Sequence, residues 1–251
     1  MQRFHEIAEV SQRVHIPLSN DKIHRLAEIC QIHTGTRVLD LGCGKGELLN
    51  QWAREYHIQG VGVDEDAESI DEAQERAHEL EVWSQTNFIV SHLGDYIQPF
   101  HQYHVVSHLS TVPFAGDLVR TIDVMREGLR SHELGLLLIG ETFWEQDPPH
   151  ALFDEIAVEA SVVPHLSDLS DAFDQTDVDL LDMVLADKRE MDMYHAGQWR
   201  STLNWLRANP SDPEAGDIQA WLRENRRNYL KFERQYLGWG VFVLMVEGTG
   251  E

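Results

Sequence analysis

A glycine-rich turn is the feature of this sequence best suited to hold a ligand. Residues 38–47 (VLDLGCGKGE) join an apolar strand to a helix, and Gly42, Gly44 and Gly46 tolerate positive φ and let a ligand approach the backbone closely. The start of the following helix carries positive partial charge, which favours a carboxylate or a phosphate. The segment therefore predicts a binding site for a small molecule that carries an anionic group.

Two carboxylates accompany this turn. Asp40 stands directly before it, and Asp64 ends the next predicted strand, where its carboxylate can accept hydrogen bonds from both hydroxyls of a ribose. An ordinary tight turn, with Asp64 capping the following helix, is the structural alternative. The spacing Gly-x-Gly-x-Gly differs from the Gly-x-Gly-x-x-Gly of dinucleotide sites, so it disfavours an NAD-type oxidoreductase.

The composition limits the classes of partner. The 251 residues carry a net charge of -23, with 43 acidic against 20 basic side chains, and such a field repels a phosphate backbone and an anionic membrane. We therefore expect a small-molecule partner, no nucleic acid and no membrane, with a homodimer left open. An N-terminus without an apolar stretch, and two cysteines (Cys30 and Cys43) without a disulfide framework, predict a cytoplasmic protein.

Strands and helices alternate along the first part of the chain. Strands are expected at residues 37–41, 60–63, 87–90, 105–109 and 134–140, and helices at residues 19–32, 46–56, 67–80 and 118–129. This alternation is typical of βαβ units, so it predicts a parallel sheet with helices on both faces.

The pattern changes after residue 141. Helices are expected at residues 152–160 and 166–173, and strands at 178–185 and 241–246. Between those strands runs a polar, aromatic-rich helical stretch from about 191 to 236, broken at residues 209–213. Because this stretch interrupts the final two strands, we expect one domain over residues 1–251, with residues 190–236 inserted as a helical cap over the sheet.

The turn, its flanking strand and Asp64 together resemble the class I S-adenosylmethionine-dependent methyltransferases. The resemblance covers roughly residues 20–187 and 238–247. It implies an α/β, Rossmann-like, doubly wound sheet of seven strands in the order 3-2-1-4-5-7-6, with the last strand antiparallel. It also implies S-adenosyl-L-methionine as cofactor, with the turn at the methionine moiety and Asp64 at the ribose. The implied cofactor-binding residues are Asp40, Gly42, Cys43, Gly44, Gly46, Asp64, Glu65, His92, Leu93 and Ser107.

A closer similarity appears further along the chain. Residues 138–144 (LIGETFW) are similar to an Ile-Gly-Glu-Pro-Tyr-Trp stretch in a little-characterised group of bacterial methyltransferases, where it lies at the end of strand five. Residues 182–187, 205–210 and 236–242 also match that group, so the similarity extends nearly from end to end. The group has no assigned reaction that could be transferred to this chain.

The sequence departs from the superfamily at three places. His92 stands where the third strand usually ends in an acid facing the adenine, with Asp95 as a substitute if the register shifts, and His104 stands where the fourth strand usually begins with an acid. Imidazole can still hydrogen-bond an adenine edge, whereas His104 is expected to be structural. Residues 110–113 (STVP) also differ from the related group, and that loop normally borders the methyl acceptor.

Methyl transfer requires mainly that the acceptor be held in line with the methyl group, with a base only where the acceptor loses a proton. Glu141, at the end of the fifth predicted strand, is the first candidate for this base or for acceptor binding, and His108 is the second. Several aromatic residues could line a pocket or pack the cap: Trp144, Tyr194, Trp199, Trp205 and Tyr229.

The histidines at positions 101, 104 and 108 do not predict a metal site, because positions i and i+4 on a strand lie about 13 Å apart, at ~3.3 Å per residue. The sequence thus predicts a methyltransferase that acts on a small molecule. The alternative to catalysis is a protein that binds the cofactor without transferring the methyl group, and His92, His104 and the altered loop at 110–113 motivate it.

Overall fold

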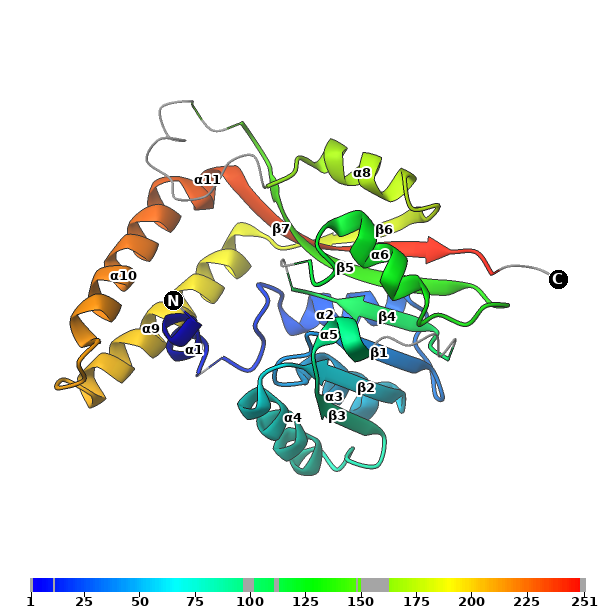
Figure 1. Ribbon diagram of the computed structural model, residues 1–251, viewed down its shortest axis with the longest axis horizontal. Helices are drawn as coiled ribbons and strands as arrows, with labels where there is room; N and C mark the ends of the chain where they lie inside the picture. Colours follow the sequence, from blue (N-terminus) through cyan, green and yellow to red (C-terminus); the bar gives the residue numbers. More distant parts are fainter. Residues whose placement is uncertain are drawn as a thin grey trace. The chain divides into compact units, whose positions relative to one another are not determined.

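The computed structural model describes residues 2–10, 12–96, 102–110, 113–147, 149 and 163–248, and these form two compact units (Figure 1). The sheet unit comprises Ser19–Glu141, Ser167–Leu185 and Gly240–Glu251. The helical unit comprises Met1–Leu18, Thr142–Leu166 and Ala186–Trp239. No helix within the described residues is long and apolar enough to cross a membrane.

The core of the sheet unit is one seven-stranded sheet in the order β3-β2-β1-β4-β5-β7-β6, which confirms the expected topology. The pairs β1–β2, β2–β3, β1–β4 and β4–β5 are parallel, and β6 pairs antiparallel with β7. Because the carboxyl ends of parallel strands lie along one edge, the residues that follow β1, β2, β3, β4 and β5 gather there. The strands are β1 (Arg37–Leu41), β2 (Gln59–Asp64), β3 (Thr86–Val90), β4 (Val105–His108), β5 (Gly135–Trp144), β6 (Asp179–Leu185) and β7 (Leu237–Val246).

Amphipathic helices connect these strands. In α3, which follows the glycine turn, Leu49 and Trp52 are fully buried, and the carboxylate of Asp66 caps the start of α4 by accepting from two backbone N–H groups. The central strands β1 and β4 are almost entirely buried, as expected for strands covered on both faces, and besides apolar residues they bury Asp40, Ser107 and His108. The helices of this unit are α2 (Asn20–Ile29), α3 (Glu47–Tyr56), α4 (Ala67–Glu79), α5 (Leu93–Tyr96), α6 (Leu118–Arg126) and α8 (Leu166–Asp174).

The sheet elements lie close to their expected positions, with three differences. The short helix α5 was not expected, because four residues are too few to form a recognisable hydrophobic period. Strand β5 continues to Trp144 and β7 begins at Leu237, beyond the expected limits at residues 140 and 241. The helix expected at residues 152–160 lies outside the described residues.

The helical unit consists mainly of α1 (Gln2–Glu9), α9 (Lys188–Ala208), α10 (Ala215–Asn228), the π-helical turn η1 (Tyr229–Glu233) and α11 (Arg234–Tyr236). Asp187 and Glu190 form a capping box at the start of α9. The N-terminal segment packs on α9: Tyr194 Oη donates to the carbonyl of His15 (3.1 Å), and Gln12 Nε2 donates to the carbonyl of Tyr194 (2.8 Å).

The expected helical stretch thus forms α9 to α11, and the compact unit also takes in the N-terminus and residues that follow β5. Within it, His195 stacks on Tyr229 with ring centroids 3.9 Å apart, and Tyr194 and Trp199 surround the same ring. These aromatic residues therefore pack against one another. The placement of residues 190–236 as a cap over the sheet stays a prediction.

Candidate functional site

The glycine turn between β1 and α3 has the backbone conformation that its sequence requires. Gly42, Gly44 and Gly46 have φ of 72°, 50° and 67°. The backbone N–H groups of Gly42 and Cys43 donate to the carbonyl of Val63 on β2, at 2.8 and 3.1 Å. The turn is therefore fixed to the neighbouring strand before any ligand binds.

Glycines also allow the close packing beneath the turn. A Cβ at Gly46 would lie 2.5 Å from the Phe88 ring, and one at Gly62 would lie 2.8 Å from Cys43 Sγ. Gly62 and Phe88 were not recognised from the sequence as supports of the turn, although a glycine inside a strand is a known sign of close backbone approach.

Asp64 is held across the turn by two backbone groups. The N–H of Gly44 donates to Asp64 Oδ2 (2.8 Å), and the N–H of Asp66 donates to Asp64 Oδ1 (3.0 Å). Each carboxylate oxygen can accept a second hydrogen bond, so the side chain keeps capacity for two donors of a ligand. From the sequence, Asp64 could either bind a ribose or cap the following helix. The structure shows that Asp66, and not Asp64, caps α4.

Asp40 lies inside the sheet and is 3% exposed, and its register partner on the adjacent strand β4 is Ser107. Ser107 Oγ donates to Asp40 Oδ1 at 2.7 Å. Burial raises the pKa of Asp40 to about 7; the Ser107 hydrogen bond opposes this shift and the charge of Asp64 adds to it. An ionised Asp40 would thus be a buried negative charge directly behind the glycine turn.

Three further predicted residues lie beside the turn or at the ends of the adjoining strands. Leu93 is buried, and its Cδ1 lies 3.8 Å from the Cβ position of Gly42. Glu65 and His92 follow β2 and β3, and their side chains approach to 3.4 Å (Glu65 Oε1 to His92 Nε2) while remaining more than half exposed. Asp95, the alternative to His92, lies within α5.

His108 is buried against the turn, 3% exposed, with Nδ1 3.6 Å from the Cβ position of Gly42. Nδ1 lies 2.9 Å from the carbonyl oxygen of Leu41, and since a carbonyl only accepts, Nδ1 carries the proton of the neutral ring. The lone pair is then on Nε2. Phe114, which sequence reasoning did not identify, packs its ring edge-to-face on His108, with centroids 5.0 Å apart.

Glu141 is half-buried and lies within β5, three residues before the strand ends at Trp144, whereas the sequence predicted it at the strand end. His108 is registered with Ile139, so Glu141 stands two residues beyond it on the adjacent strand. Gly140 allows this arrangement, because a Cβ there would lie 2.5 Å from the carbonyl oxygen of Leu109. The loop predicted to border the acceptor is described at Ser110 and Pro113 only, and residues 111–112 lie outside the described residues.

His104 has a structural role at the opposite end of β4. Its Nδ1 accepts from the backbone N–H of Arg37 (2.9 Å), while Arg130 Nη1 lies 2.8 Å from Nε2. Burial and the charge of Arg130 lower the pKa of this imidazole, which favours the neutral ring. Among the described residues, no three histidine, cysteine or acidic side chains lie together as a metal site would require, and residue 101 is outside them.

The site is therefore a fixed glycine turn at the carboxyl edge of the sheet, with two acids beneath and beside it and two candidate bases on the next two strands. Several known proteins are similar to this chain in sequence and in fold. Residues 38–132 match the family model described as a methyltransferase domain. The uncharacterized protein YjhP of Escherichia coli K12 is 34% identical, and the match covers 97% of this chain and 98% of that protein.

Two solved structures match over nearly the full length. A methyltransferase dependent on S-adenosylmethionine (SAM) from Geobacter sulfurreducens, in complex with S-adenosyl-L-homocysteine, is 34% identical with a TM-score of 0.90, covering 98% of both chains. A SAM-dependent methyltransferase from Thiobacillus denitrificans, in the same type of complex, is 33% identical with a TM-score of 0.90, covering 98% of this chain and 99% of that one. Identity at this level over whole chains places the protein in the family of SAM-dependent methyltransferases.

Proposed function

We propose that this protein transfers a methyl group from SAM to a small molecule at the carboxyl edge of the sheet. The observation that carries the proposal is the arrangement of the glycine turn and Asp64. Two backbone N–H groups hold the Asp64 carboxylate in place, and each of its oxygens can still accept one more hydrogen bond.

The described residues fit SAM in both charge and space. The turn keeps Gly42, Gly44 and Gly46 at positive φ, a backbone conformation that suits close approach of the methionine moiety. Asp64 is assigned to the ribose hydroxyls. Glu65, His92 and Leu93 are assigned to the adenine side. Cys43 belongs to the turn itself, and Asp40 and Ser107 support the turn from β1 and β4.

When bound, SAM supplies a methyl group already activated on a sulfonium, so the protein's task is to hold an acceptor atom in line with it. Two groups can take up a proton that the acceptor loses. His108 has the lone pair on Nε2, since Nδ1–H is directed to Leu41. Glu141 offers a carboxylate from the next strand, and this carboxylate is also a candidate for binding the acceptor.

The acceptor is proposed to be small and not a nucleic acid. The net charge of -23 disfavours a polyanionic substrate. A neutral or cationic acceptor does not meet this repulsion.

Calorimetric titration with SAM, S-adenosylhomocysteine and NAD tests the cofactor assignment. We expect both adenosyl ligands to bind and NAD not to bind. Asp64→Ala should weaken SAM binding by roughly 10-fold or more, because it removes charge-assisted hydrogen bonds. The control is Asp71→Ala, which removes an exposed acid of α4 and should leave the affinity unchanged. Unchanged affinity in Asp64→Ala would refute the ribose assignment.

Catalysis itself is tested by incubating the protein with SAM labelled in the methyl group and a pool of metabolites. Label should appear in a small product, and this product should form roughly 100-fold more slowly in a parallel incubation with Glu141→Gln. Binding of SAM with no transfer to any acceptor in the pool would contradict catalysis and favour a cofactor-binding protein.

A further inference from the structure

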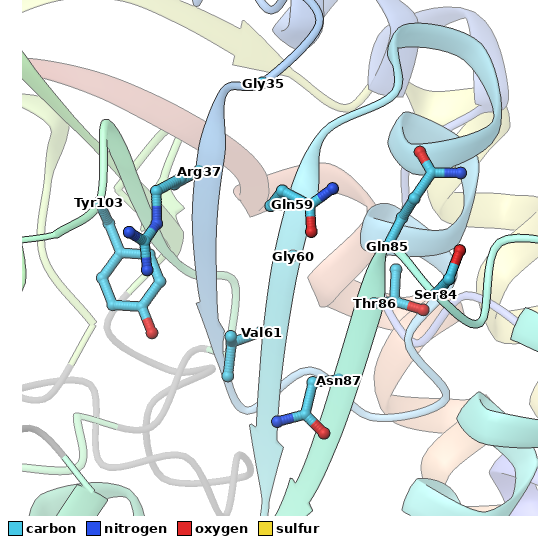
Figure 2. A pocket seen from close by; sticks show the side chains of 10 residues that line it. All are labelled: Gly35, Arg37, Gln59, Gly60, Val61, Ser84, Gln85, Thr86, Asn87 and Tyr103. Atoms are coloured by element: carbon cyan, nitrogen blue, oxygen red, sulfur yellow. The ribbon is translucent and has the colours of Figure 1, made fainter.

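A second cavity lies at the opposite ends of the strands from the glycine turn. Arg37 begins β1, Gln59 begins β2 and Thr86 begins β3, so the cavity opens along the amino edge of the parallel strands (Figure 2). Its volume of about 360 Å³ falls within the ~300–1,000 Å³ that is typical of small-molecule sites. The lining residues are Gly35, Arg37, Gln59, Gly60, Val61, Ser84, Gln85, Thr86, Asn87 and Tyr103.

The charge of this cavity is opposite to that of the protein as a whole. The chain has 43 acidic residues, yet no carboxylate is among the ten lining residues, and the one ionised side chain there is Arg37. Its guanidinium donates to the neutral amide oxygen of Gln102 (2.5 Å) and lies 5.8 Å from the centroid of the Tyr103 ring. Arg37 makes no ion pair with a carboxylate in the part of the chain that the structure describes.

Polar side chains line the cavity next to Arg37, and those of Gln59 and Asn87 are open to solvent. Figure 2 shows Arg37 and Tyr103 on one side, Gln59 and Asn87 nearer the centre, and Ser84 and Gln85, which precede β3, on the other side. Within the described residues, the side-chain amides of Gln59 and Asn87 form no hydrogen bond. Gln85 Oε1 is buried without a partner. Amides both donate and accept, so they match amide or carbonyl groups of a ligand.

We propose that this cavity binds a small anionic metabolite, with its carboxylate or phosphate on Arg37 and a neighbouring amide or carbonyl group on Gln59 and Asn87. A guanidinium forms paired hydrogen bonds to such anions, and the short amides opposite select a small planar polar group. The site is separate from the one assigned to SAM and the methyl acceptor, because it lies at the other end of β1 and β2.

The test uses N-acetylglycine, which joins one carboxylate to one amide, and its neutral counterpart N-acetylglycinamide, in calorimetric or NMR titrations. We expect the anion to bind and the neutral compound to bind at least ~10-fold more weakly, as for the loss of a charge-assisted hydrogen bond. Inorganic phosphate is titrated in parallel: competition with N-acetylglycine indicates a phosphate-bearing ligand, and its absence indicates a carboxylate. Failure of both anions to bind would overturn the proposal.

Three variants distinguish specific binding in the cavity from nonspecific attraction of an anion to surface arginines. Arg37→Gln and Asn87→Ala should each weaken N-acetylglycine binding, by roughly 10-fold and roughly 3-fold. Arg223→Gln, which removes an exposed arginine of the helical unit, should have no effect. Equal weakening by Arg37→Gln and Arg223→Gln, or no effect of Asn87→Ala, would reduce the cavity to a surface charge and overturn the proposal.

The same variants are titrated with S-adenosylhomocysteine. Unchanged binding of that ligand shows that the variants are folded and that the outcome concerns the second cavity alone. Loss of S-adenosylhomocysteine binding in Arg37→Gln would contradict the separation of the two sites.

Discussion

Replacing Asp40 by asparagine should make the protein more stable, and increasingly so as the pH rises. The Asp40 carboxyl is 3% exposed, and burial raises its pKa from the ordinary 3.8 to about 7. A raised carboxyl pKa means that the folded state binds the proton more tightly than the unfolded state. Stability is therefore lost as the pH rises from 3.8 through about 7, where the buried group ionises.

The size of the effect follows from this pKa. At ~1.36 kcal/mol for each pKa unit, ionised Asp40 costs the folded state roughly 4 kcal/mol above pH 7, of which roughly 2–3 kcal/mol develops between pH 5 and pH 7. The Asp40→Asn side chain cannot ionise, and its amide oxygen can still accept from Ser107 Oγ. The difference in unfolding free energy between variant and wild type should thus widen by roughly 3 kcal/mol from pH 5 to pH 8.

Urea unfolding at about pH 5 and about pH 8, at constant ionic strength, measures this difference. Asp71→Asn is the matched control, because it removes the same charge from an exposed position on α4 and should leave the pH dependence unchanged. If Asp40→Asn and wild type lose stability in parallel over this range, the carboxyl is not held neutral by burial and the reasoning fails.

In the same variant, stability and SAM affinity should change in opposite directions. SAM carries a positive sulfonium, and an ionised Asp40 behind the turn favours a cation there. Asp40→Asn is therefore expected to bind SAM more weakly at pH 8 despite its greater stability, and to lose less affinity for S-adenosylhomocysteine, which lacks the sulfonium charge. Equal losses for the two ligands would contradict an electrostatic role for Asp40.

Three further predictions concern the turn and the candidate bases. Gly46→Ala should lower the unfolding free energy by roughly 2–4 kcal/mol, because Gly46 has positive φ and an added Cβ would lie 2.5 Å from Phe88. The control Gly216→Ala in α10, where nothing lies within 4 Å of the added Cβ, should be neutral or stabilising, and equal effects of the two variants in urea unfolding would refute this packing argument. Glu141→Gln should reduce kcat by roughly 100-fold with little change in S-adenosylhomocysteine affinity, and loss of both together would instead indicate a structural role. His108→Asn should remove the acidic limb of the pH–rate profile if Nε2 accepts a proton, and an unchanged profile would assign the proton transfer elsewhere.

The glycine turn and Asp64 could be predicted from the sequence because their signal is local. The turn occupies five consecutive positions, residues 42–46, and the distance from it to Asp64 is set by one helix and one strand. The strand order is a different case, because alternating elements predict a parallel sheet but not its order, which the family resemblance supplied.

The protonation states could not be predicted because they depend on partners distant in sequence. Asp40 and Ser107, and likewise His108 and Leu41, are 67 positions apart, and they meet only because β4 pairs with β1. The second cavity was missed for a related reason. Arg37, Gln59 and Asn87 lie at the starts of three different strands, and none of them forms a motif with its own neighbours in sequence.

The helical unit joins parts of the chain that are synthesised at very different times. Helix α1 packs on α9, and Arg3 bonds to Asp212 across 209 positions of the chain. At a typical ~5–20 residues per second, the first helix leaves the ribosome roughly 10–40 s before its partners exist. Residues 19–141 can begin to fold in that interval, while α1 lacks the helix on which it packs. The amino-terminal segment can therefore take up its packed position only after α9 has been synthesised.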